Sequence, residues 1–211
     1  NGGEGIGLFR TEFLFMDRMS RPTEAEQFEA YATVAKAMNG REVIIRTLDI
    51  GGDKEIPYLE IEKEDNPFLG HRAIRYCLDH PDLFCDQIRA ILRAAKFGDL
   101  KLMLPLITCK EEILAAKKLI EQCLRELIEA GEDVHPVPVG IMVETPAAAL
   151  TAAELAKEAD FFSFGTNDLT QMTFGFSRDD AGKFLGAYYD KKIYESDPFA
   201  RLDQTGVGKL V

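Results

Sequence analysis

The chain is poor in histidine, in cysteine and in positive charge. Its three histidines are scattered, which argues against a histidine-based metal site. Four cysteines without a Cys-x-x-Cys spacing argue against a zinc site or a disulfide framework, and we expect them to be reduced core residues. They are Cys77, Cys85, Cys109 and Cys123. The formal net charge of −11 argues against binding to nucleic acid or to an anionic membrane.

Long apolar runs are also missing. No stretch is long enough to cross a bilayer and no signal-peptide pattern opens the sequence, so we expect a cytoplasmic protein without membrane insertion. The 211 residues suffice for one sizeable core, and we predict a single domain over 1–211. The sequence begins at Asn1 rather than at a methionine, so we expect a piece of a longer protein.

Short apolar runs alternate with segments of helical pattern. The predicted strands are 5–10, 43–48, 100–107, 137–143 and 161–165. The predicted helices begin at a capping box of Thr23 and Glu26, at Pro81, at a capping box of Thr108 and Glu111, and at Pro146, and they end near Asn39, Phe97, Gly131 and Ala159. This alternation predicts right-handed βαβ units and a parallel sheet.

Polar side chains gather where the predicted strands end. Arg10-Thr11-Glu12, Arg46-Thr47 with Asp49, Glu144, and Asn167-Asp168 each follow an apolar run. Both a (β/α)₈ barrel and an open doubly wound sheet place their site at this edge, so the pattern alone does not choose between them. The Gly- and charge-rich segment 50–70 is predicted to be a long loop at the same end.

The residue types at this edge suit a small anion that binds together with a divalent cation. Guanidinium groups make planar, bidentate contacts to phosphate or carboxylate oxygens, and four arginines are candidates. They are Arg10, Arg46, Arg72 and Arg178. Glu144 and Asp168 offer the hard oxygen ligands that Mg²⁺ takes together with a substrate phosphate. The implied chemistry is phosphoryl transfer, in which a protein mainly positions groups and neutralises charge.

Ordinary structural roles compete with these assignments. Arg10 alone is equally well explained by a salt bridge to Glu12, and Asp168 by capping of the next helix. The Gly51-Gly52-Asp53-Lys54 loop brings Lys54 toward a phosphate only if it is more than a turn, and it lacks Walker spacing. His71 is a candidate proton carrier, although packing is the commoner role for such a histidine.

Five segments together resemble the phosphoenolpyruvate (PEP)-binding barrel of the PEP-utilising enzymes. They are Gly-Leu-Phe-Arg-Thr-Glu-Phe (7–13), Arg-Thr-Leu-Asp-Ile-Gly-Gly-Asp-Lys (46–54), Asn-Pro-Phe-Leu-Gly-His-Arg (66–72), Gly-Ile-Met-Val-Glu-Thr-Pro (140–146) and Gly-Thr-Asn-Asp-Leu-Thr-Gln (165–171). The resemblance implies a (β/α)₈ TIM barrel of the PEP/pyruvate-binding type, present here as an incomplete fragment of about five βα units that is truncated at both ends.

The resemblance also implies roles for individual residues. Arg10, Arg46 and Arg178 resemble the arginines that hold the phosphate of PEP, with Arg72 as an accessory. Glu144 and Asp168 resemble the Mg²⁺ ligands. Asn167 resembles an asparagine that contacts PEP, and Lys54 matches an active-site lysine more loosely. In the family, a histidine on a separate domain accepts the phosphoryl group, and a cysteine in Gly-x-Cys-Gly-Glu protonates the enolate; that motif is absent here.

The resemblance leaves the phosphoryl acceptor open. Up to about Gly165 the chain is most similar to the Enzyme I branch of the sugar phosphotransferase system, which implies an HPr-type carrier protein as partner and a homodimer. Residues 171–181 and 203–208 are more similar to pyruvate phosphate dikinase. The Enzyme I pattern covers more of the chain, so we favour it. A non-catalytic PEP-binding module remains an alternative, and an aldolase-like or pyruvate-kinase-like barrel is a distant one.

Overall fold

In the computed structural model, which describes residues 2–51, 56–59 and 61–211, five parallel strands form one sheet in the order β1-β2-β3-β4-β5. The strands are β1 (Ile6–Arg10), β2 (Val43–Arg46), β3 (Leu100–Leu104), β4 (Val139–Val143) and β5 (Phe162–Phe164). Each pairs with the next one along the chain, through helical crossovers. This is the strand order of a (β/α)₈ barrel, and it confirms the predicted fold class over five βα units.

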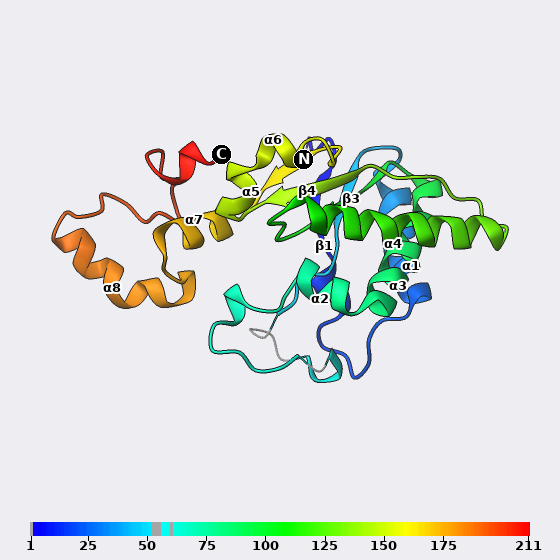
Figure 1. Cartoon of the computed structure of the whole chain (residues 1–211), viewed down its shortest axis with the longest axis horizontal. Coiled ribbons are helices and arrows are strands. Elements are labelled where there is room, and N and C mark those ends of the chain that lie inside the picture. Colours follow the sequence, from blue (N-terminus) through cyan, green and yellow to red (C-terminus); the bar gives the residue numbers. More distant parts are fainter. Residues whose placement is uncertain (1, 52–55, 60) are drawn as a thin grey trace.

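Helices follow every strand. They are α1 (Glu24–Met38), α2 (Ile74–Asp79), α3 (Pro81–Ala94), α4 (Lys110–Glu129), α5 (Pro146–Leu150), α6 (Ala152–Leu155), α7 (Thr166–Phe174) and α8 (Arg178–Asp190). Short 3₁₀ turns lie at Thr11–Leu14, Pro57–Leu59, Pro67–Leu69, Ala95–Phe97 and Val207–Lys209. Helices α1, α3 and α4 lie together on one side of the sheet, whereas α8 projects away from it (Figure 1). No helix in the described part of the chain combines the length and apolar content needed to cross a bilayer.

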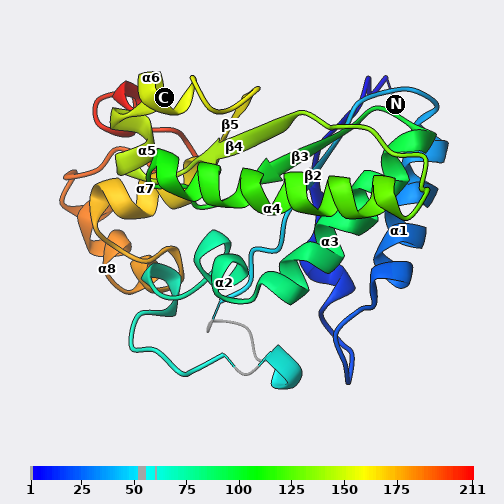
Figure 2. The ribbon, with the colours of Figure 1, turned by 45° about the vertical axis from the view of Figure 1, so that its right-hand side comes forward.

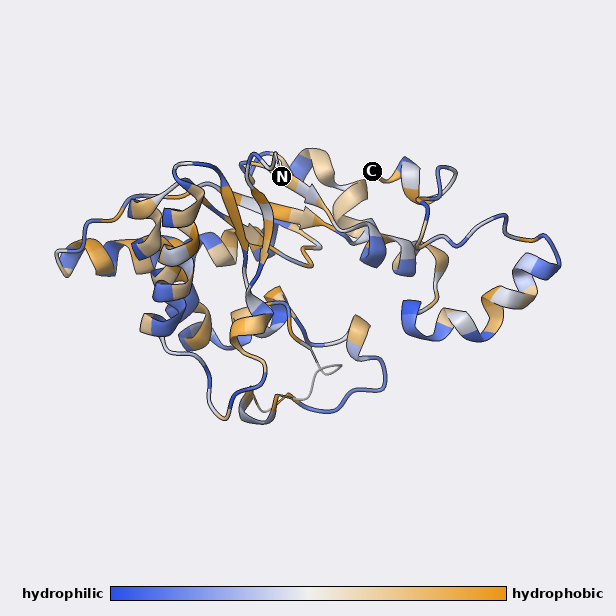
Figure 3. Cartoon of the chain, turned by 180° about the vertical axis from the view of Figure 1, so that it is seen from behind, coloured by the Kyte–Doolittle hydropathy of each residue, from blue (hydrophilic) through white to orange (hydrophobic). Residues whose placement is uncertain are grey.

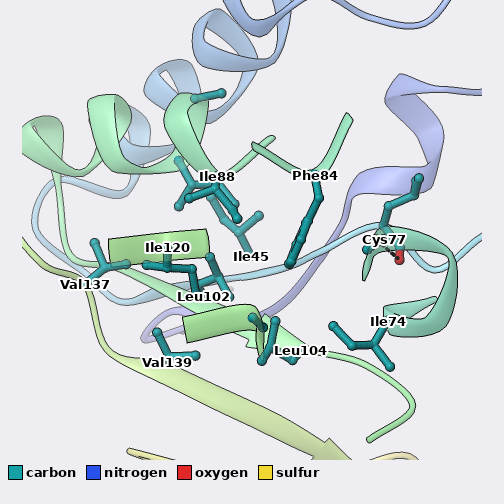
Figure 4. Close-up of a cluster of buried hydrophobic side chains, with 14 of the residues drawn as sticks. Ile45, Ile74, Cys77, Phe84, Ile88, Leu102, Leu104, Ile120, Val137 and Val139 are labelled. Carbon is teal, nitrogen blue, oxygen red and sulfur yellow. Dashed lines mark hydrogen bonds between the residues drawn. The ribbon is translucent and has the colours of Figure 1, made fainter. Parts of the chain in front are cut away.

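The core lies between the strands and the α1-α3-α4 layer. Ile45 and Leu102 are fully covered and meet Ile88 of α3 and Ile120 of α4 (Figure 4). The turned view shows α4 running across the strands (Figure 2), and several of the strands are coloured mainly as hydrophobic in Figure 3. Burial of such side chains stabilises the fold by about 1.5–3 kcal/mol each.

The sequence predicts some helix boundaries correctly and misplaces others. Thr23 and Glu26 form the predicted capping box of α1, which ends at Asn39 in a left-handed conformation. The box predicted at Thr108 and Glu111 is wrong by one residue: Cys109 caps α4, and the Glu112 carboxylate accepts from the backbone N–H groups of residues 108 and 109.

The prediction of one continuous helix from Pro146 to Ala159 is wrong. It is interrupted at Thr151, which leaves the two short helices α5 and α6. The predicted strands 43–48, 100–107 and 137–143 are each two or three residues too long, because apolar residues beyond the ladder are buried without pairing. Leu48, Leu106 and Ile107 follow β2 and β3 in the loops at the polar edge, whereas Val137 precedes β4 at the opposite edge.

A second small apolar cluster accompanies α8. Phe176 packs edge-on against Phe184 and Phe199, and Tyr188 packs against Tyr194. These contacts hold α8 to the segments on either side of it rather than to the sheet. The rings of Phe176, Phe184 and Tyr188 are only partly buried, and they form a local cluster outside the main core.

Candidate active site

Four of the predicted site residues lie together at the carboxyl ends of the strands. Arg46 ends β2, and Glu144 directly follows β4. Asp168 lies in the first turn of α7, directly after β5, and Arg72 lies in the loop that leads into α2. Because β4 and β5 are neighbours in the sheet, Glu144 and Asp168 meet at adjacent strand ends, as predicted.

The two arginines are held by carboxylates in one connected group. Arg46 Nη2 donates to Glu12 Oε1 at 2.8 Å, and Arg46 Nη1 lies 3.1 Å from Asp49 Oδ2. Arg72 donates to the other oxygen, Asp49 Oδ1, through Nη2 at 2.6 Å and through Nε at 3.2 Å. All four side chains are at most a tenth exposed. We call Glu12, Arg46, Asp49 and Arg72 the guanidinium clamp.

The electrostatics of the clamp favour charged arginines. Burial alone lowers the pKa of Arg46, but the carboxylates of Asp49 and Glu12 raise it above its ordinary value. For Arg72, burial likewise lowers the pKa and the Asp49 carboxylate raises it. The net effect is a raised pKa. Both guanidinium groups are therefore permanent charges in a site shielded from water, where their attraction for an anion is stronger than at the surface.

Glu144 is the most deeply buried carboxyl of the site. Its Oε1 accepts a hydrogen bond from the Leu106 N–H at 2.5 Å, whereas its Oε2 is buried and has no hydrogen-bond partner among the described residues. Burial, followed by the charges of Asp168 and Asp49, raises the pKa of Glu144 to about 8. Burial also raises the pKa of Asp168, which interacts directly with Glu144. Two carboxyl groups that face each other in this way require a proton or a cation between them.

Two local backbone features place Glu144. Leu106 has a φ of 56°, a left-handed conformation that is costly for a leucine, and this conformation presents its N–H to the carboxylate. Gly165 leaves room on the other side, because a Cβ there would lie 2.4 Å from Glu144 Oε2. Sequence analysis missed both residues. For Gly165, the glycine that precedes Thr-Asn-Asp was the available signal in the sequence. For Leu106 there was none, because a strained backbone conformation does not show in the amino-acid sequence.

Charge balance shows what the site needs. Four carboxyl groups surround two guanidinium groups, so full ionisation leaves a surplus of negative charge. Arg46 Nε is a buried donor without an acceptor among the described residues, and Glu144 Oε2 is a buried acceptor without a donor. An anion oxygen satisfies the first and a cation the second. The residues present therefore fit a divalent cation bound with an anion.

Protein ligands alone do not complete a metal site. Within the described ranges, no group of three or more histidine, cysteine, aspartate or glutamate side chains is arranged to hold a metal. Magnesium is commonly bound by one or two carboxylates, with water and substrate phosphate oxygens supplying the rest. Glu144 and Asp168 suit that mode.

The remaining predicted residues lie outside the connected group. Arg10 is in register with Arg46 on the neighbouring strand, but its exposed side chain lines a surface hollow beside Phe13. Asn167 is exposed next to Asp168. Arg178 begins α8, where its side chain is exposed and its backbone N–H donates to Gln171 Oε1 at 2.8 Å. Lys54 lies outside the described residues.

Glu12 is a functional candidate that sequence analysis assigned differently. It was considered as a salt-bridge partner of Arg10, but in the structure it pairs with Arg46 across the strands. The 3₁₀ turn after β1 buries Glu12, which is only 4% exposed, and directs its side chain to β2. The Arg-Thr-Glu sequence was the signal, but a pairing across strands is not visible in it.

His71 and the cysteines have structural partners. His71 Nε2 lies 2.8 Å from Asp79 Oδ2, and its backbone N–H donates to Glu64. All four cysteines are free thiols: three are buried in the core, and the partly exposed Cys109 caps α4. Burial raises the pKa of Cys77 above its ordinary value, which makes this thiol a poor nucleophile.

This fold and this site suit a small anion together with a divalent cation, and comparison with known proteins identifies the family. Residues 1–211 match the family model described as "PEP-utilising enzyme, PEP-binding domain". The chain belongs to the PEP-utilising enzymes.

Individual relatives are similar over most of the chain. It is 56% identical over 191 residues to the phosphoenolpyruvate-protein phosphotransferase of Haemophilus influenzae, which covers 90% of this chain and 33% of that protein. It is 53% identical over 179 residues to the enzyme of the same name from Bacillus subtilis, covering 84% of this chain and 31% of that protein. The chain therefore spans about a third of the length of these curated relatives. A citrate lyase structure from Burkholderia xenovorans covers 82% of this chain and 56% of that chain at a TM-score of 0.40 and 21% identity, too distant to bear on function.

Proposed function

We propose that this chain binds PEP together with Mg²⁺ and presents its phosphoryl group to a histidine of the natural protein that carries the chain. The observation that carries the proposal is the pair of unsatisfied buried atoms, Arg46 Nε and Glu144 Oε2, at one strand edge. Arg46 Nε needs an acceptor, such as an anion oxygen, and Glu144 Oε2 needs a donor or a cation. PEP with a divalent cation supplies both, and the family and the relatives make PEP the substrate of choice.

The clamp supplies the anion contacts. Arg46 and Arg72 present N–H groups in fixed planes to phosphate oxygens, and Arg10, Arg178 and Asn167 are proposed as further contacts. Lys54 belongs to the same proposal. Such preorganised donors stabilise charge on the transferring group without rearranging during the reaction.

Glu144 and Asp168 would hold the cation. When bound, Mg²⁺ supplies charge neutralisation for the phosphate and carboxylate of PEP. In the proposed transfer, the bond between phosphorus and the enol oxygen breaks and a bond from phosphorus to a histidine nitrogen forms. The electron pair of the broken bond stays on the enol oxygen, which gives the enolate of pyruvate.

The name of the relatives, phosphoenolpyruvate-protein phosphotransferase, favours a protein as the phosphoryl acceptor. From the resemblance to the Enzyme I branch, the proposal takes a histidine as the first acceptor and an HPr-type carrier as the next, within cytoplasmic sugar phosphotransfer by a homodimer. A pyruvate phosphate dikinase role has one observation in its favour, the likeness of residues 171–181 and 203–208 to that enzyme. The two roles differ in the partner of the phosphohistidine: a carrier protein in the first role, or the pyruvate, ATP and phosphate chemistry of a dikinase in the second.

The test uses the complete natural protein that contains these residues. Incubation with PEP and Mg²⁺ should form an acid-labile phosphohistidine and release pyruvate, and Arg46→Ala should abolish both PEP binding and labelling. A Lys157→Ala variant, which removes an exposed ion pair with Glu154, is the matched control and should behave as the unmodified protein. Unchanged PEP affinity in Arg46→Ala would refute the assignment.

A further inference from the structure

Asp49 lies between the two arginines of the clamp and touches both. Its Oδ1 accepts from Arg72 Nη2 at 2.6 Å and its Oδ2 lies 3.1 Å from Arg46 Nη1. Each oxygen of one carboxylate thus serves a different guanidinium group. Neither the family match nor the relatives' names assign a role to this residue.

The backbone around Asp49 is anchored on both sides. The Leu48 N–H donates to the buried Gln87 Oε1 at 2.9 Å, and the Leu48 carbonyl accepts from Cys77 Sγ. The Ile50 carbonyl accepts from the Ala73 N–H at 3.3 Å, which ties this loop to the loop that carries Arg72. Asp49 is therefore a fixed point, and the arginines are positioned relative to it.

Arginine side chains are long, and ordering one costs side-chain entropy. Glu12 restrains Arg46 from one side, and Phe68 contacts Arg72 through its ring and its carbonyl. Asp49 forms close ion pairs with both guanidinium groups and so sets their mutual orientation. Its negative charge opposes an incoming anion, so a carboxylate at this position is useful only if its ordering of the guanidinium groups outweighs that repulsion.

We propose that Asp49 is a positioning residue that aligns Arg46 and Arg72 for one phosphate group before the ligand arrives. The identity of the ligand as PEP rests on the proposed function, whereas the alignment does not. The alignment predicts that both guanidinium groups are held in the unliganded protein. It also predicts that loss of the Asp49 carboxylate weakens phosphate binding despite removing a repulsive charge.

The first measurement needs no substitution. In the unliganded, complete natural protein, the Nη–H protons of Arg46 and Arg72 should give separate NMR signals, because rotation of a held guanidinium group is slow. Rotationally averaged signals from both residues would overturn the proposal. The exposed Arg178 is the internal reference and should show averaged signals.

The second measurement compares variants by reaction with phenylglyoxal, read at each arginine by peptide mass spectrometry. Asp49→Asn should raise the modification rate of both Arg46 and Arg72 about tenfold, as loss of a buried charge partner requires. Glu42→Gln is the matched control: it removes a carboxylate from an ion pair with Lys101 at the opposite end of the same strands. Equal rates in Asp49→Asn and Glu42→Gln would overturn the proposal.

PEP titrations separate this proposal from the proposed function. With Mg²⁺ present, the dissociation constant of PEP should rise at least about tenfold in Asp49→Asn and stay unchanged in Glu42→Gln. If the unmodified protein binds no PEP while the arginine signals behave as stated, the alignment stands and the proposed function falls. If the unmodified protein binds PEP and Asp49→Asn binds it equally well or more tightly, the alignment falls and the proposed function stands.

Discussion

Glu144 and Asp168 reach the same point from the ends of neighbouring strands, and their carboxyl groups interact directly. Glu144 is fully covered and has one oxygen bound by the Leu106 N–H and the other without a partner among the described residues. Such a pair is unfavourable when both carboxyl groups are ionised and no cation lies between them. The pair therefore links protonation to stability in this chain, and in the proposed function it links both to the binding of Mg²⁺.

The first prediction concerns stability against pH without metal. The fold raises the pKa of Glu144 from 4.5 to about 8, so the folded state binds more protons than the unfolded state between these values. The free energy of unfolding should then be greatest near pH 4.5 in this window and fall as the pH rises through 8. Thermal unfolding of the chain, followed by circular dichroism across this range, measures the slope.

A variant and a metal titration check the source of that slope. Glu144→Gln should flatten it, and saturating Mg²⁺ should flatten it in the unmodified chain, because a cation replaces the proton. The pKa of Glu26 is lowered to about 2, so its contribution to the free energy of unfolding changes only below pH 4.5. It therefore does not affect the slope between pH 4.5 and 8. An equal slope in Glu144→Gln would assign the pH dependence to other groups.

The second prediction concerns Gly165. In Gly165→Ala the new Cβ would lie 2.4 Å from Glu144 Oε2 and 2.6 Å from Glu144 Cβ, so the carboxylate must move. We expect a stability loss of about 1–3 kcal/mol and a loss of Mg²⁺ binding by calorimetry.

Gly182→Ala is the matched control for Gly165→Ala. Gly182 lies within α8, where a Cβ would meet nothing within 4 Å. Alanine there should stabilise the helix by about 0.5–1 kcal/mol and leave Mg²⁺ binding unchanged. Normal Mg²⁺ binding by Gly165→Ala would show that Glu144 does not need the position described.

The third prediction concerns the clamp as a buried charge network. Arg46→Ala leaves Glu12 and Asp49 buried beside an empty space, which should cost about 3–5 kcal/mol of stability. Lys183→Ala removes the exposed partner of Asp180 and should cost far less, because ion pairs in water contribute little to stability. Denaturant unfolding of both variants gives the comparison, and equal costs would contradict the burial of the clamp.

The sequence was a good guide where structure depends on local patterns. Strand-helix alternation and the polar residues after each apolar run predicted the parallel sheet and placed Arg46, Glu144 and Asp168 at one edge. The Thr23 capping box predicted the start of α1, because that signal lies within four residues. These features depend on residues that are close together in the sequence, so the sequence pattern is enough to predict them.

Features that depend on contacts between distant segments were not visible. The pairing of Glu12 with Arg46 spans 34 residues and requires the register of β1 against β2. The strained Leu106 and the close approach of Gly165 to Glu144 depend on how three loops meet. Asp49 was noted near Arg46, but its link to Arg72 needs the loop before α2 to fold back.

The most direct test of the central claim is whether metal and PEP occupy one site. With Mn²⁺ in place of Mg²⁺, the ³¹P NMR signal of PEP bound to the complete natural protein should be strongly broadened by the nearby paramagnetic ion. The broadening should disappear in Glu144→Gln and Asp168→Asn and persist in Glu42→Gln. Bound PEP whose signal is broadened equally in all four proteins, or in none, would contradict a shared site at Glu144 and Asp168.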